Sequence, residues 1–450
     1  MRLNSVAPRT CRDRSKFCVA PSAAWPALAA RAVASSTSRW GWAPAGADVS
    51  EPAKAAIAVR AMRRRMVRRA YRSWTSTLCL SLSVGVYGSG SRGYSQTMGS
   101  IDQDTLKKLS FRVWSFKMGE VVALMIHLGD RLGLYEALAG GGRNHAAEIA
   151  TTTNLDERMV HEWLLGQAAA ELIERHEDGS FEMSREAALV LASEGELPFA
   201  CGAFYGGETP EGTDAIVDAF KSGAGFTYGD MGDRSADQLD RMNAAWLERY
   251  LPETVLPSLS GLIEKLEDGA DVADIGCGGA IAISSLARRF PNSRFVGFDP
   301  SEPAIRAGRR RVGDLQNVEL HIASGEDLRE PQMFDFIMTL DCMHDMAHPD
   351  RVASAIKAAL RSDGIWLIKD MRCGPNFDDN LNNPMLAMMY GFSVSGCLPS
   401  SMSSEGGMAL GTLGFPPVVA EQMVNDAGFD SFQIHEFESD PVHYYYEVAH

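Results

Sequence analysis

No segment of this 450-residue chain is hydrophobic over a length that could cross a membrane. The most apolar stretch near the start covers residues 78–86, whereas a membrane-spanning helix needs about 20 apolar residues. We therefore predict no transmembrane segment and no membrane partner. With 45% hydrophobic residues, the chain can bury the core of one large domain or of two ordinary domains.

Regularly spaced cysteines are absent as well. The eight cysteines occupy positions 11, 18, 79, 201, 277, 342, 373 and 397, and no two of them form a Cys-x-x-Cys pair. This scatter argues against a disulfide framework or a zinc site of paired cysteines, and it favours free thiols in a reducing compartment. We expect the protein to be cytoplasmic.

Acidic residues are almost missing from residues 1–97, which hold 16 Lys and Arg but only 3 Asp and Glu. Three interpretations of this segment are open. The first is a disordered or misassigned extension, because Met98-Gly99-Ser100 resembles a natural start. The second is a transit peptide, which would place the protein in the mitochondrion or another organelle. The third is a basic arm, at residues 63–69, that binds polyanions. In each case we exclude the segment from the fold.

The chain after residue 97 is acidic, with 27 Lys and Arg against 55 Asp and Glu. A body of this charge repels nucleic acid and anionic membranes over about one Debye length. We therefore do not expect nucleic acid as a partner.

Residues 115–195 show the pattern of a small helical domain followed by a hairpin. Apolar residues from Val121 to Tyr135 recur at helical spacing and predict one buried stripe, which ends at the glycines 140–142. A short helix at 145–150 and a third helix capped by Asn154 or Asp156 follow. Residues 173–183 predict two short strands around an Asp-Gly turn. Together these elements predict a winged-helix domain.

The charge of this domain bears on its role. Residues 155–182, the third helix and the wing, carry eight acidic residues against Arg158 and Arg175. Phosphate contacts need the opposite sign. We therefore favour dimerisation and a wall of the pocket over DNA recognition for residues 115–195.

Residues 196–260 predict a helical connection punctuated by glycine and proline. It contains two aromatic–glycine loops, at residues 204–207 and 226–229, and a helix from Ala236 to Leu251 that we expect Pro252 to end. Its large side chains can be core or the roof of a binding site, and the sequence leaves both open.

Strands and helices alternate from residue 261 to residue 450. Apolar strands are predicted at 271–275, 294–298, 317–322, 334–340 and 364–369, helices at 280–290, 302–312 and 350–361, and a closing helix (418–427) with two strands (431–438 and 443–448). Strands that are apolar on both faces and separated by helices indicate a parallel sheet covered on both sides. In such sheets ligands bind beyond the carboxyl ends of the strands.

A glycine turn lies at one of these ends, in Asp274-Ile275-Gly276-Cys277-Gly278-Gly279-Ala280, and the next strand ends at Asp299. An acid in that place can accept hydrogen bonds from both hydroxyls of a ribose. Ile281 stands where a dinucleotide site has its third glycine, and no Gly-Lys-Ser/Thr follows, so NAD, FAD, ATP and GTP are disfavoured. The pattern predicts a nucleoside site without a phosphate cradle.

The spacing of Asp274, Gly276, Gly278 and Ala280 resembles the first motif of class I S-adenosylmethionine (SAM) methyltransferases, which usually have glycine at position 280. Residues 115–449 are similar to two-domain methyltransferases of the bacterial type, at Gly133-Leu134, Leu155-Asp156-Glu157-Arg158, Glu162-Trp163-Leu164, Gly276-Cys277-Gly278, Gly297-Phe298-Asp299 and His344-Asp345-Met346. The resemblance implies an α/β fold, with a Rossmann-like, doubly wound, seven-stranded sheet over residues 261–450 and a mainly α winged-helix domain before it. It also implies SAM as cofactor, homodimers and a small-molecule acceptor.

The resemblance also implies roles for particular residues. The cofactor set is Asp274, Gly276, Cys277, Gly278, Asp299, Ser324, Gly325, Asp327, Leu340 and Asp341. Ser324 stands where the family usually has an aspartate that holds the adenine, so Gly325 or Asp327 is expected to substitute for it. Asp370, Met385, Met388, Met389, Tyr390 and Phe392 are acceptor-pocket candidates, and the core is the alternative for the methionines.

His344 and Asp345 resemble the His-Asp pair that supplies the base in small-molecule O-methyltransferases. Histidine suits the removal of a proton from a hydroxyl, because its pKa lies near working pH; the alternative is a structural role for His344. A zinc pair of His344 and His348 is disfavoured, because Pro349 interrupts the helix it would need, and we predict no metal site.

We therefore predict a SAM-dependent methyltransferase that acts on a small molecule, at oxygen, with His344 as base. Methylation of nitrogen or carbon is the alternative within enzymes. A SAM-sensing winged-helix transcriptional regulator and a catalytically inactive scaffold are the alternatives outside them.

Overall fold

The computed structural model describes residues 101–328 and 331–450, and Ser100–His450 form one unit of the chain. The predictions for residues 1–97, namely the extension, the transit peptide and the basic arm, lie outside the described residues. Within the described part, no helix combines the length and the apolar character that crossing a membrane requires.

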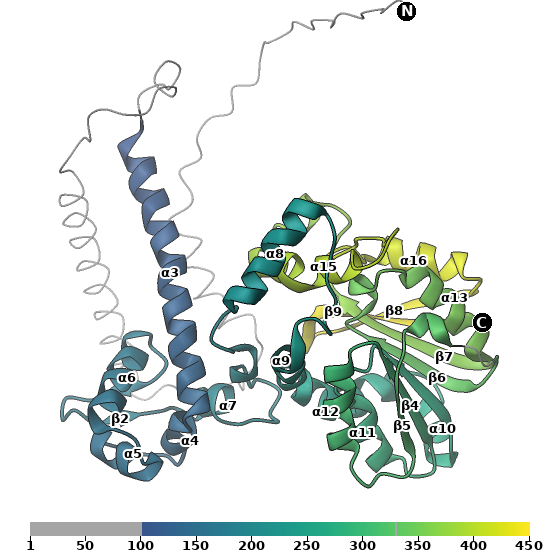
Figure 1. Cartoon of the computed structure of the whole chain (residues 1–450). Coiled ribbons are helices and arrows are strands. Elements are labelled where there is room, and N and C mark those ends of the chain that lie inside the picture. Colours follow the sequence, from purple (N-terminus) through teal and green to yellow (C-terminus); the bar gives the residue numbers. More distant parts are fainter. Residues whose placement is uncertain (1–100, 329–330) are drawn as a thin grey trace, which may run out of the picture. The chain divides into compact units, whose positions relative to one another are not determined.

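A winged-helix domain comes first (Figure 1). It consists of α3 (Gln103–Arg131), α4 (Leu134–Ala139), α5 (Ala146–Thr153), α6 (Glu157–Ala169), the antiparallel strands β1 (Glu174–Arg175) and β2 (Phe181–Glu182), and α7 (Arg185–Leu191). Its core includes the fully buried side chains of Leu164 and Phe181. Asp156 caps α6 by accepting from the Met159 amide at 3.0 Å, whereas Asn154 ends α5 in the left-handed region.

The predicted stripe on the first helix is wrong in two respects. The helix begins at Gln103 and breaks at Gly133, whose φ is +69°. Tyr135 is buried as expected, but Val121, Leu124, Leu128 and Leu132 are exposed. The buried face is displaced because α3 packs through Ile126 and Gly129, where any Cβ would collide with the Trp163 ring.

Helices connect this domain to the sheet. The connection holds η1 (Cys201–Ala203), α8 (Pro210–Ser222), α9 (Gly232–Ala245), the π-helical η2 (Trp246–Val255), η3 (Leu256–Ser258) and α10 (Leu262–Asp268). Pro252 does not end the helix as predicted, because the helix widens into a π-helix that continues to Val255. Pro252 has no N–H group and cannot donate to the Glu248 carbonyl as an α-helical residue would. This carbonyl accepts instead from Ser285 Oγ at 3.3 Å.

The seven-stranded sheet has the order β5-β4-β3-β6-β7-β9-β8. Its strands are β3 (Asp271–Ile275), β4 (Arg294–Asp299), β5 (Val318–Ile322), β6 (Phe334–Leu340), β7 (Leu360–Met371), β8 (Ser431–Phe437) and β9 (Asp440–Ala449). The first five are parallel, and β9 and β8 close the sheet as an antiparallel hairpin. The predicted Rossmann-like, doubly wound sheet is confirmed.

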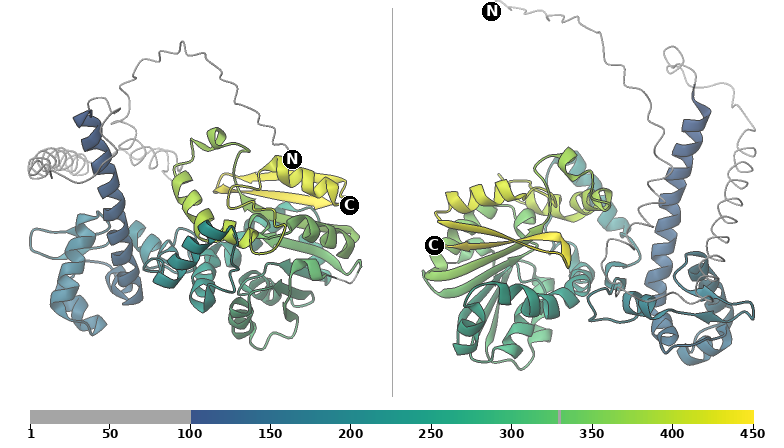
Figure 2. Two further views of the ribbon diagram at one scale, coloured as in Figure 1. Left: turned by 45° about the horizontal axis from the view of Figure 1, so that its top comes forward. Right: turned by 180° about the vertical axis from the view of Figure 1, so that it is seen from behind.

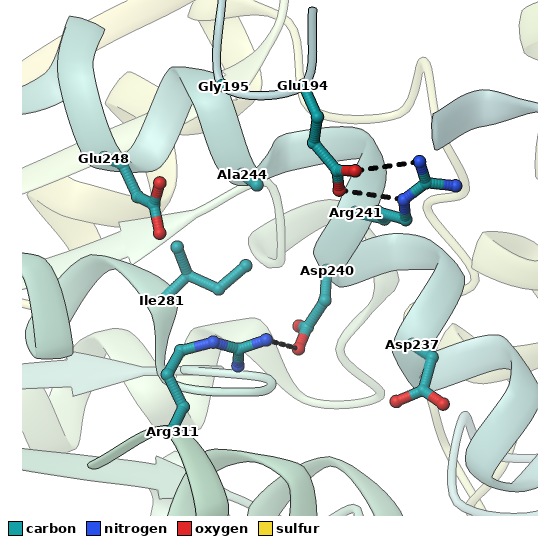
Figure 3. A pocket seen from close by; sticks show the side chains of 9 residues that line it. All are labelled: Glu194, Gly195, Asp237, Asp240, Arg241, Ala244, Glu248, Ile281 and Arg311. Atoms are coloured by element: carbon teal, nitrogen blue, oxygen red, sulfur yellow. Dashed lines mark hydrogen bonds and ion pairs between the residues drawn. The ribbon is translucent and has the colours of Figure 1, made fainter. Parts of the chain in front are cut away.

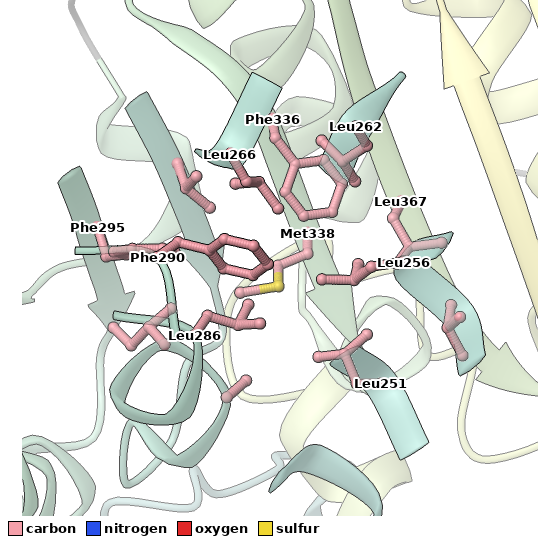
Figure 4. Close-up of a cluster of buried hydrophobic side chains, with 14 of the residues drawn as sticks. Leu251, Leu256, Leu262, Leu266, Leu286, Phe290, Phe295, Phe336, Met338 and Leu367 are labelled. Atoms are coloured by element: carbon pink, nitrogen blue, oxygen red, sulfur yellow. The ribbon is translucent and has the colours of Figure 1, made fainter. Parts of the chain in front are cut away.

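Helices cover both faces of this sheet (Figure 2). The helices between and after the strands are α11 (Ile281–Arg289), α12 (Glu302–Val312), α13 (Pro349–Ala359) and α16 (Pro417–Asp426). Leu251 of η2, Leu266 of α10 and Leu286 of α11 pack on one face of the sheet (Figure 4). Residues of α13 and α16 pack on the other face, around Trp366. The two cores fix the strands, so the loops at their carboxyl ends are held in place.

Those loops contain the remaining short elements. They are η4 (Gly325–Asp327) after β5, η5 (Met343–Asp345) after β6, and η6 (Phe377–Asn380), α14 (Leu386–Phe392), the π-helical η7 (Ser393–Cys397) and α15 (Leu398–Ser401) after β7.

Candidate functional site

The glycine turn after β3 is anchored to the end of β4. The amides of Gly276 and Cys277 both donate to the Phe298 carbonyl, at 2.8 and 3.1 Å. Gly276 has φ +76°, and a Cβ there would lie 2.8 Å from Cys342 Sγ, so this position requires glycine. Around Gly278, whose φ is +52°, the nearest atom to an added Cβ is Asp240 Oδ1 at 3.9 Å, which leaves room for a ligand.

Ala280 starts α11 in the left-handed region, with φ +60°. An L-residue pays about 1–2 kcal/mol for this conformation. Its methyl group is fully buried and faces Gly308 of α12, where an added Cβ would come within 3.1 Å. The alanine therefore fills space at the packing of α11 against α12, while the turn keeps the path that a glycine would give it.

Asp299 and Asp274 place two carboxyl groups beside the turn. Asp299 accepts from the amides of Gly278 at 2.9 Å and Ser301 at 2.8 Å, so each oxygen keeps capacity for a further donor. Asp274 is buried and its Oδ1 has no hydrogen-bond partner. Burial, and secondarily the charge of Asp299, raises the pKa of Asp274 to about 8. The turn thus presents acceptors that only a donor or a cation would satisfy.

The loops after β5 and β6 differ in what they leave available. The Ser324 side chain accepts from the Glu326 amide at 3.3 Å, and Asp327 accepts from the Ser324 amide at 3.3 Å, so both shape η4 itself. Gly325 is buried, and a Cβ there would meet Ile275 at 2.5 Å. The available groups of this loop are therefore backbone atoms and the partly exposed Ser324 hydroxyl.

The end of β6 carries a buried ion pair. Asp341, with φ +57°, pairs with Lys369, which is itself 2% exposed and lies 4.2 Å from the centre of the Trp246 ring. Burial alone would raise the pKa of Asp341, but Lys369 and His443 lower it, and the net shift is downward. Leu340 beside it packs on the core of the sheet. Asp341 is therefore a fixed negative charge in the region predicted for the middle of the cofactor.

His344 lies on η5 and is buried, with 3% exposed. Its Nδ1 is 2.8 Å from Asp370 Oδ1, and Asp370, at the end of β7, is fully buried. Burial works against a charged ring, but Asp370 outweighs it, so the pKa of His344 is raised. The carboxylate bonded to His344 Nδ1 is Asp370, and the predicted catalytic part of Asp345 stays a prediction.

The η5 segment also touches the glycine turn. Cys342 Sγ donates to the Ile275 carbonyl at 3.2 Å, and Met346 lies 3.7 Å from where a Gly276 Cβ would be. Burial raises the pKa of Asp345 to about 7, although His344 and a hydrogen bond from Tyr228 work against the rise. The segment that carries His344 thus packs against the glycine turn.

Asp240 of α9 reaches the same turn from the connecting segment. It accepts from the Gly279 amide at 3.2 Å and pairs with Arg311 at 2.8 Å, and Arg311 also donates to the Gly279 carbonyl. A cavity of about 450 Å³ opens behind this clamp (Figure 3), lined by Glu194, Gly195, Asp237, Asp240, Arg241, Ala244, Glu248, Ile281 and Arg311. These lining residues include none of the predicted cofactor set.

Two families match separate parts of the chain. A family described as a methyltransferase domain matches residues 272–364, and an Rv2258c-like winged HTH domain matches residues 120–193. The ubiquinone biosynthesis O-methyltransferase of Neisseria meningitidis serogroup A is 29% identical over 112 residues, which are 24% of this chain and 46% of that protein. The chain thus spans less than half the length of this curated relative.

Solved structures agree with the fold of the whole described unit. Human N-acetylserotonin methyltransferase in complex with SAM has a TM-score of 0.56 and 14% identity, covering 78% of this chain and 99% of that one. An O-methyltransferase family protein from Burkholderia thailandensis has a TM-score of 0.51 and 18% identity, covering 78% and 98%. The chain therefore contains a methyltransferase domain that follows a winged-helix domain, and its fold is that of these methyltransferase structures.

The residues of this methyltransferase domain fit SAM in chemistry. Asp299 retains acceptor capacity for ribose hydroxyls, Gly278 leaves room for a ligand, and Asp274 offers an unpartnered buried oxygen to a cationic group. Cys277 is buried beside them in the turn. The assignment of individual residues to SAM stays a prediction.

The residues predicted for the acceptor pocket are brought together only in part. Asp370 joins His344, and Met389 is buried on α14. Met388, Tyr390 and Phe392 are exposed, and Met385 is partly exposed. His348, considered as a zinc partner of His344, instead lies 2.9 Å from Ser404 Oγ.

Sequence reasoning missed three groups at the site: Asp240, Tyr228 and Cys397. Tyr228 sits in the second aromatic–glycine loop, and its hydroxyl lies 3.6 Å from Cys397 Sγ. A tyrosine between glycines was the available signal. For Asp240 and Cys397 the sequence carries no such signal. Each lies on a helix, and only the fold determines which side of that helix faces the site.

Proposed function

We propose that this protein transfers a methyl group from SAM to a hydroxyl group of a small-molecule acceptor, with His344 as general base. The observation that carries the proposal is the buried His344–Asp370 pair, at 2.8 Å, on a segment that packs against the glycine turn. SAM, when bound, supplies an electrophilic methyl group on a sulfonium. The protein has to align the acceptor and take up its proton.

The geometry gives each residue of the pair a distinct part. Asp370 accepts from Nδ1–H, which leaves Nε2 as the nitrogen that can take a proton. The carboxylate makes that nitrogen more basic, and the positive form of the ring is disfavoured near a sulfonium. His344 therefore holds a neutral Nε2 toward the acceptor hydroxyl when cofactor and acceptor are both bound.

The cofactor set is part of the same proposal. Asp299 would bind the ribose hydroxyls, the 276–278 turn would lie against the amino-acid portion with Asp274 facing its positive groups, and Gly325 would contact the adenine by its backbone. Asp341 would fix the polar atoms where the two halves meet. Calorimetric titration of S-adenosylhomocysteine into wild type and Asp299→Ala tests this part, and binding that the substitution leaves unchanged would contradict it.

The base is tested by His344→Gln in a methyl-transfer assay over a panel of phenols and other hydroxyl compounds. We expect kcat to fall by about 10²- to 10⁴-fold, the usual contribution of a general base, while S-adenosylhomocysteine binding is retained. His348→Gln, on the same segment but bonded to Ser404, is the matched control and should keep its rate. A His344→Gln enzyme with wild-type kcat would overturn the assignment.

We also propose that the protein forms homodimers through α3. Trp114, Met118, Val121 and Leu128 recur at helical spacing and are all exposed, Trp114 by 63%. A row of this kind on one helix is typical of an interface. Light scattering on the wild type and on the Met118→Glu, Val121→Glu double variant tests this, with Lys117→Glu as control; a monomeric wild type would contradict it.

We infer that nucleic acid is not the ligand of the winged helix. Arg158 on α6 is paired with Glu162 at 2.6 Å, and Arg143 beside the wing lies 3.8 Å from Asp178. These two arginines are therefore paired with carboxylates where phosphates would have to bind. Saturable binding of a mixed-sequence duplex at moderate salt, followed by fluorescence anisotropy, would contradict this inference.

We propose the cytoplasm as the location, because the described cysteines 201, 277, 342, 373 and 397 are all free thiols and thiols persist in a reducing compartment. Imaging of the full chain fused to a fluorescent protein tests this, and accumulation in an organelle would overturn it in favour of the transit-peptide interpretation.

A further inference from the structure

A side-chain cluster beside the proposed base has the composition of a metal site. One ligand atom each from His344, Asp345 and Cys397 lie within 4.8 Å of one another. His344 and Asp345 come from η5 and Cys397 from η7, so the fold joins segments about fifty positions apart in the sequence. We propose that these three residues bind a thiophilic divalent metal ion, of which zinc matches the donor set best.

The donor atoms determine which metal fits. A thiolate with an imidazole and a carboxylate suits zinc, whereas magnesium and calcium take oxygen ligands. Zinc bonds of about 2.0–2.3 Å in a tetrahedral arrangement place ligand atoms roughly 3.3–3.7 Å apart. The present separations of up to 4.8 Å therefore need a contraction of about 1 Å, which rotation of the Asp345 and Cys397 side chains can provide.

The surroundings of His344 support a ligand role. Its Nδ1 is held by Asp370 at 2.8 Å, so Nε2 is the nitrogen left for a metal. Metal-bound histidines usually donate their other ring nitrogen to a carboxylate, which fixes the ring and strengthens the ligand. Asp370 is fully buried and occupies that place already.

The site also has an entrance and an open position. Cys397 is partly exposed, so an ion can reach it. It lies in a π-helical turn, a widened geometry found mostly at functional sites. Three protein ligands leave a fourth position open, as in zinc sites that exchange a ligand, and the Tyr228 hydroxyl, 3.6 Å from Cys397 Sγ, borders it.

This inference departs from our sequence prediction of no metal site, and the metal binding does not depend on the proposed function. Its consequence does rest on that function. A metal on Nε2 occupies the nitrogen that would take the acceptor proton, so zinc should inhibit methyl transfer. The site would then couple activity to the level of available zinc.

Cobalt(II) is the spectroscopic probe, because a thiolate bound to it gives an intense near-ultraviolet charge-transfer band. The full chain, treated with chelator and then freed of it, is titrated with cobalt without SAM or acceptor. We expect a saturable band that Cys397→Ser abolishes and Cys201→Ser keeps, since the Cys201 thiol is buried and donates to the Leu191 carbonyl. The result is independent of whether the chain transfers methyl groups.

Two further variants keep the test decisive. Asp345→Asn removes a ligand without touching the thiol and should weaken cobalt binding. Asp370→Asn should weaken it by about 10- to 100-fold, as loss of a residue that supports a ligating histidine does. Circular dichroism checks that each variant is folded. A spectrum that is the same in folded Cys397→Ser as in wild type would place the metal on other cysteines and overturn the proposal.

Discussion

The carboxyl group of Asp274 is buried without a partner for Oδ1, and its pKa is raised to about 8, chiefly by burial. In the folded protein without ligand it is therefore neutral at pH 6 and ionised only above pH 8. A cation bound next to it favours the ionised form, so binding of a cation releases a proton below pH 8.

We expect SAM affinity to increase between pH 6 and pH 8.5, by up to about tenfold per pH unit below the shifted pKa. S-adenosylhomocysteine, which lacks the sulfonium, should show a smaller dependence, and Asp274→Asn should remove it. Calorimetry in two buffers of different ionisation enthalpy measures the released proton directly. An unchanged pH slope in Asp274→Asn would show that another group is responsible.

The same pKa shift of Asp274 also determines how the stability of the protein changes with pH. A carboxyl whose folded pKa lies above its unfolded value binds protons more tightly in the folded state. The stability it contributes is full below about pH 4, the unfolded pKa, and is lost as the pH rises through the folded value of about 8. Asp274→Asn should therefore stabilise the free protein at pH 8.5 more than at pH 5, which thermal unfolding at the two pH values checks.

Helix α9 contacts the glycine turn through one partly buried ion pair. Asp240 accepts from the Gly279 amide and pairs with Arg311, which binds the Gly279 carbonyl in turn. Burial outweighs Arg311 and raises the pKa of Asp240, so the pair stabilises the turn by hydrogen bonding more than by full charge.

Asp240→Ala should weaken S-adenosylhomocysteine binding, because the turn loses its only side-chain acceptor on the Gly279 amide among the described residues. In the double variant Asp240→Ala, Arg311→Ala, the loss of binding free energy should differ from the sum of the two single losses by about 0.5–3 kcal/mol, as for residues in direct contact. Asp237→Ala, one turn earlier on α9 and exposed on the same cavity, is the control and should bind normally. Additive losses would mean that the clamp does not exist in solution.

The elements that sequence patterns predicted well are those with local causes. Runs such as residues 271–275 and 334–340 are mostly apolar, as a strand covered on both faces requires, and the glycine turn and Asp299 follow from adjacent residues. The predicted end of the 236–251 helix at Pro252 was wrong, because η2 continues through the proline and the Glu248 carbonyl finds a distant donor, Ser285. The predicted buried stripe on α3 was wrong, because periodicity shows which residues share a face but not whether other elements cover that face.

The site residues, too, could be predicted only as far as their neighbours in the sequence determine them. His344 was predicted from its place after a strand, and the carboxylate bonded to it, Asp370, is 26 positions away, on the neighbouring strand β7. The sequence favoured Asp345, which is adjacent in the chain. The sheet sets the direction of side chains at the end of a strand, and the sequence alone does not show that direction. Asp240 and Cys397 come from helices whose contacts are tertiary, and no spacing rule reaches them.

Arg241 is one of the residues that join the connecting segment to the winged-helix domain in the described part of the chain. Arg241 of α9 binds Asp130 at the end of α3 with two contacts, 2.6 and 2.8 Å, and Glu194 with two more, 2.8 and 3.0 Å. The Asp130 side chain is only 6% exposed. Arg241 thus links α3 to α9, one residue away from the Asp240 clamp on the glycine turn.

Arg241→Met should destabilise the protein by about 3 kcal/mol, because a nearly buried carboxylate loses its partner. We expect calorimetry to show a separate, earlier transition for the winged-helix domain. The double variant Arg241→Met, Asp130→Asn should recover most of the loss, since the unpaired charge is gone. Arg249→Met, which breaks the exposed pair with Glu196, is the control and should cost at most about 1 kcal/mol. If the double variant is no more stable than Arg241→Met, the loss comes from packing of the arginine and the two domains are not joined by this charge.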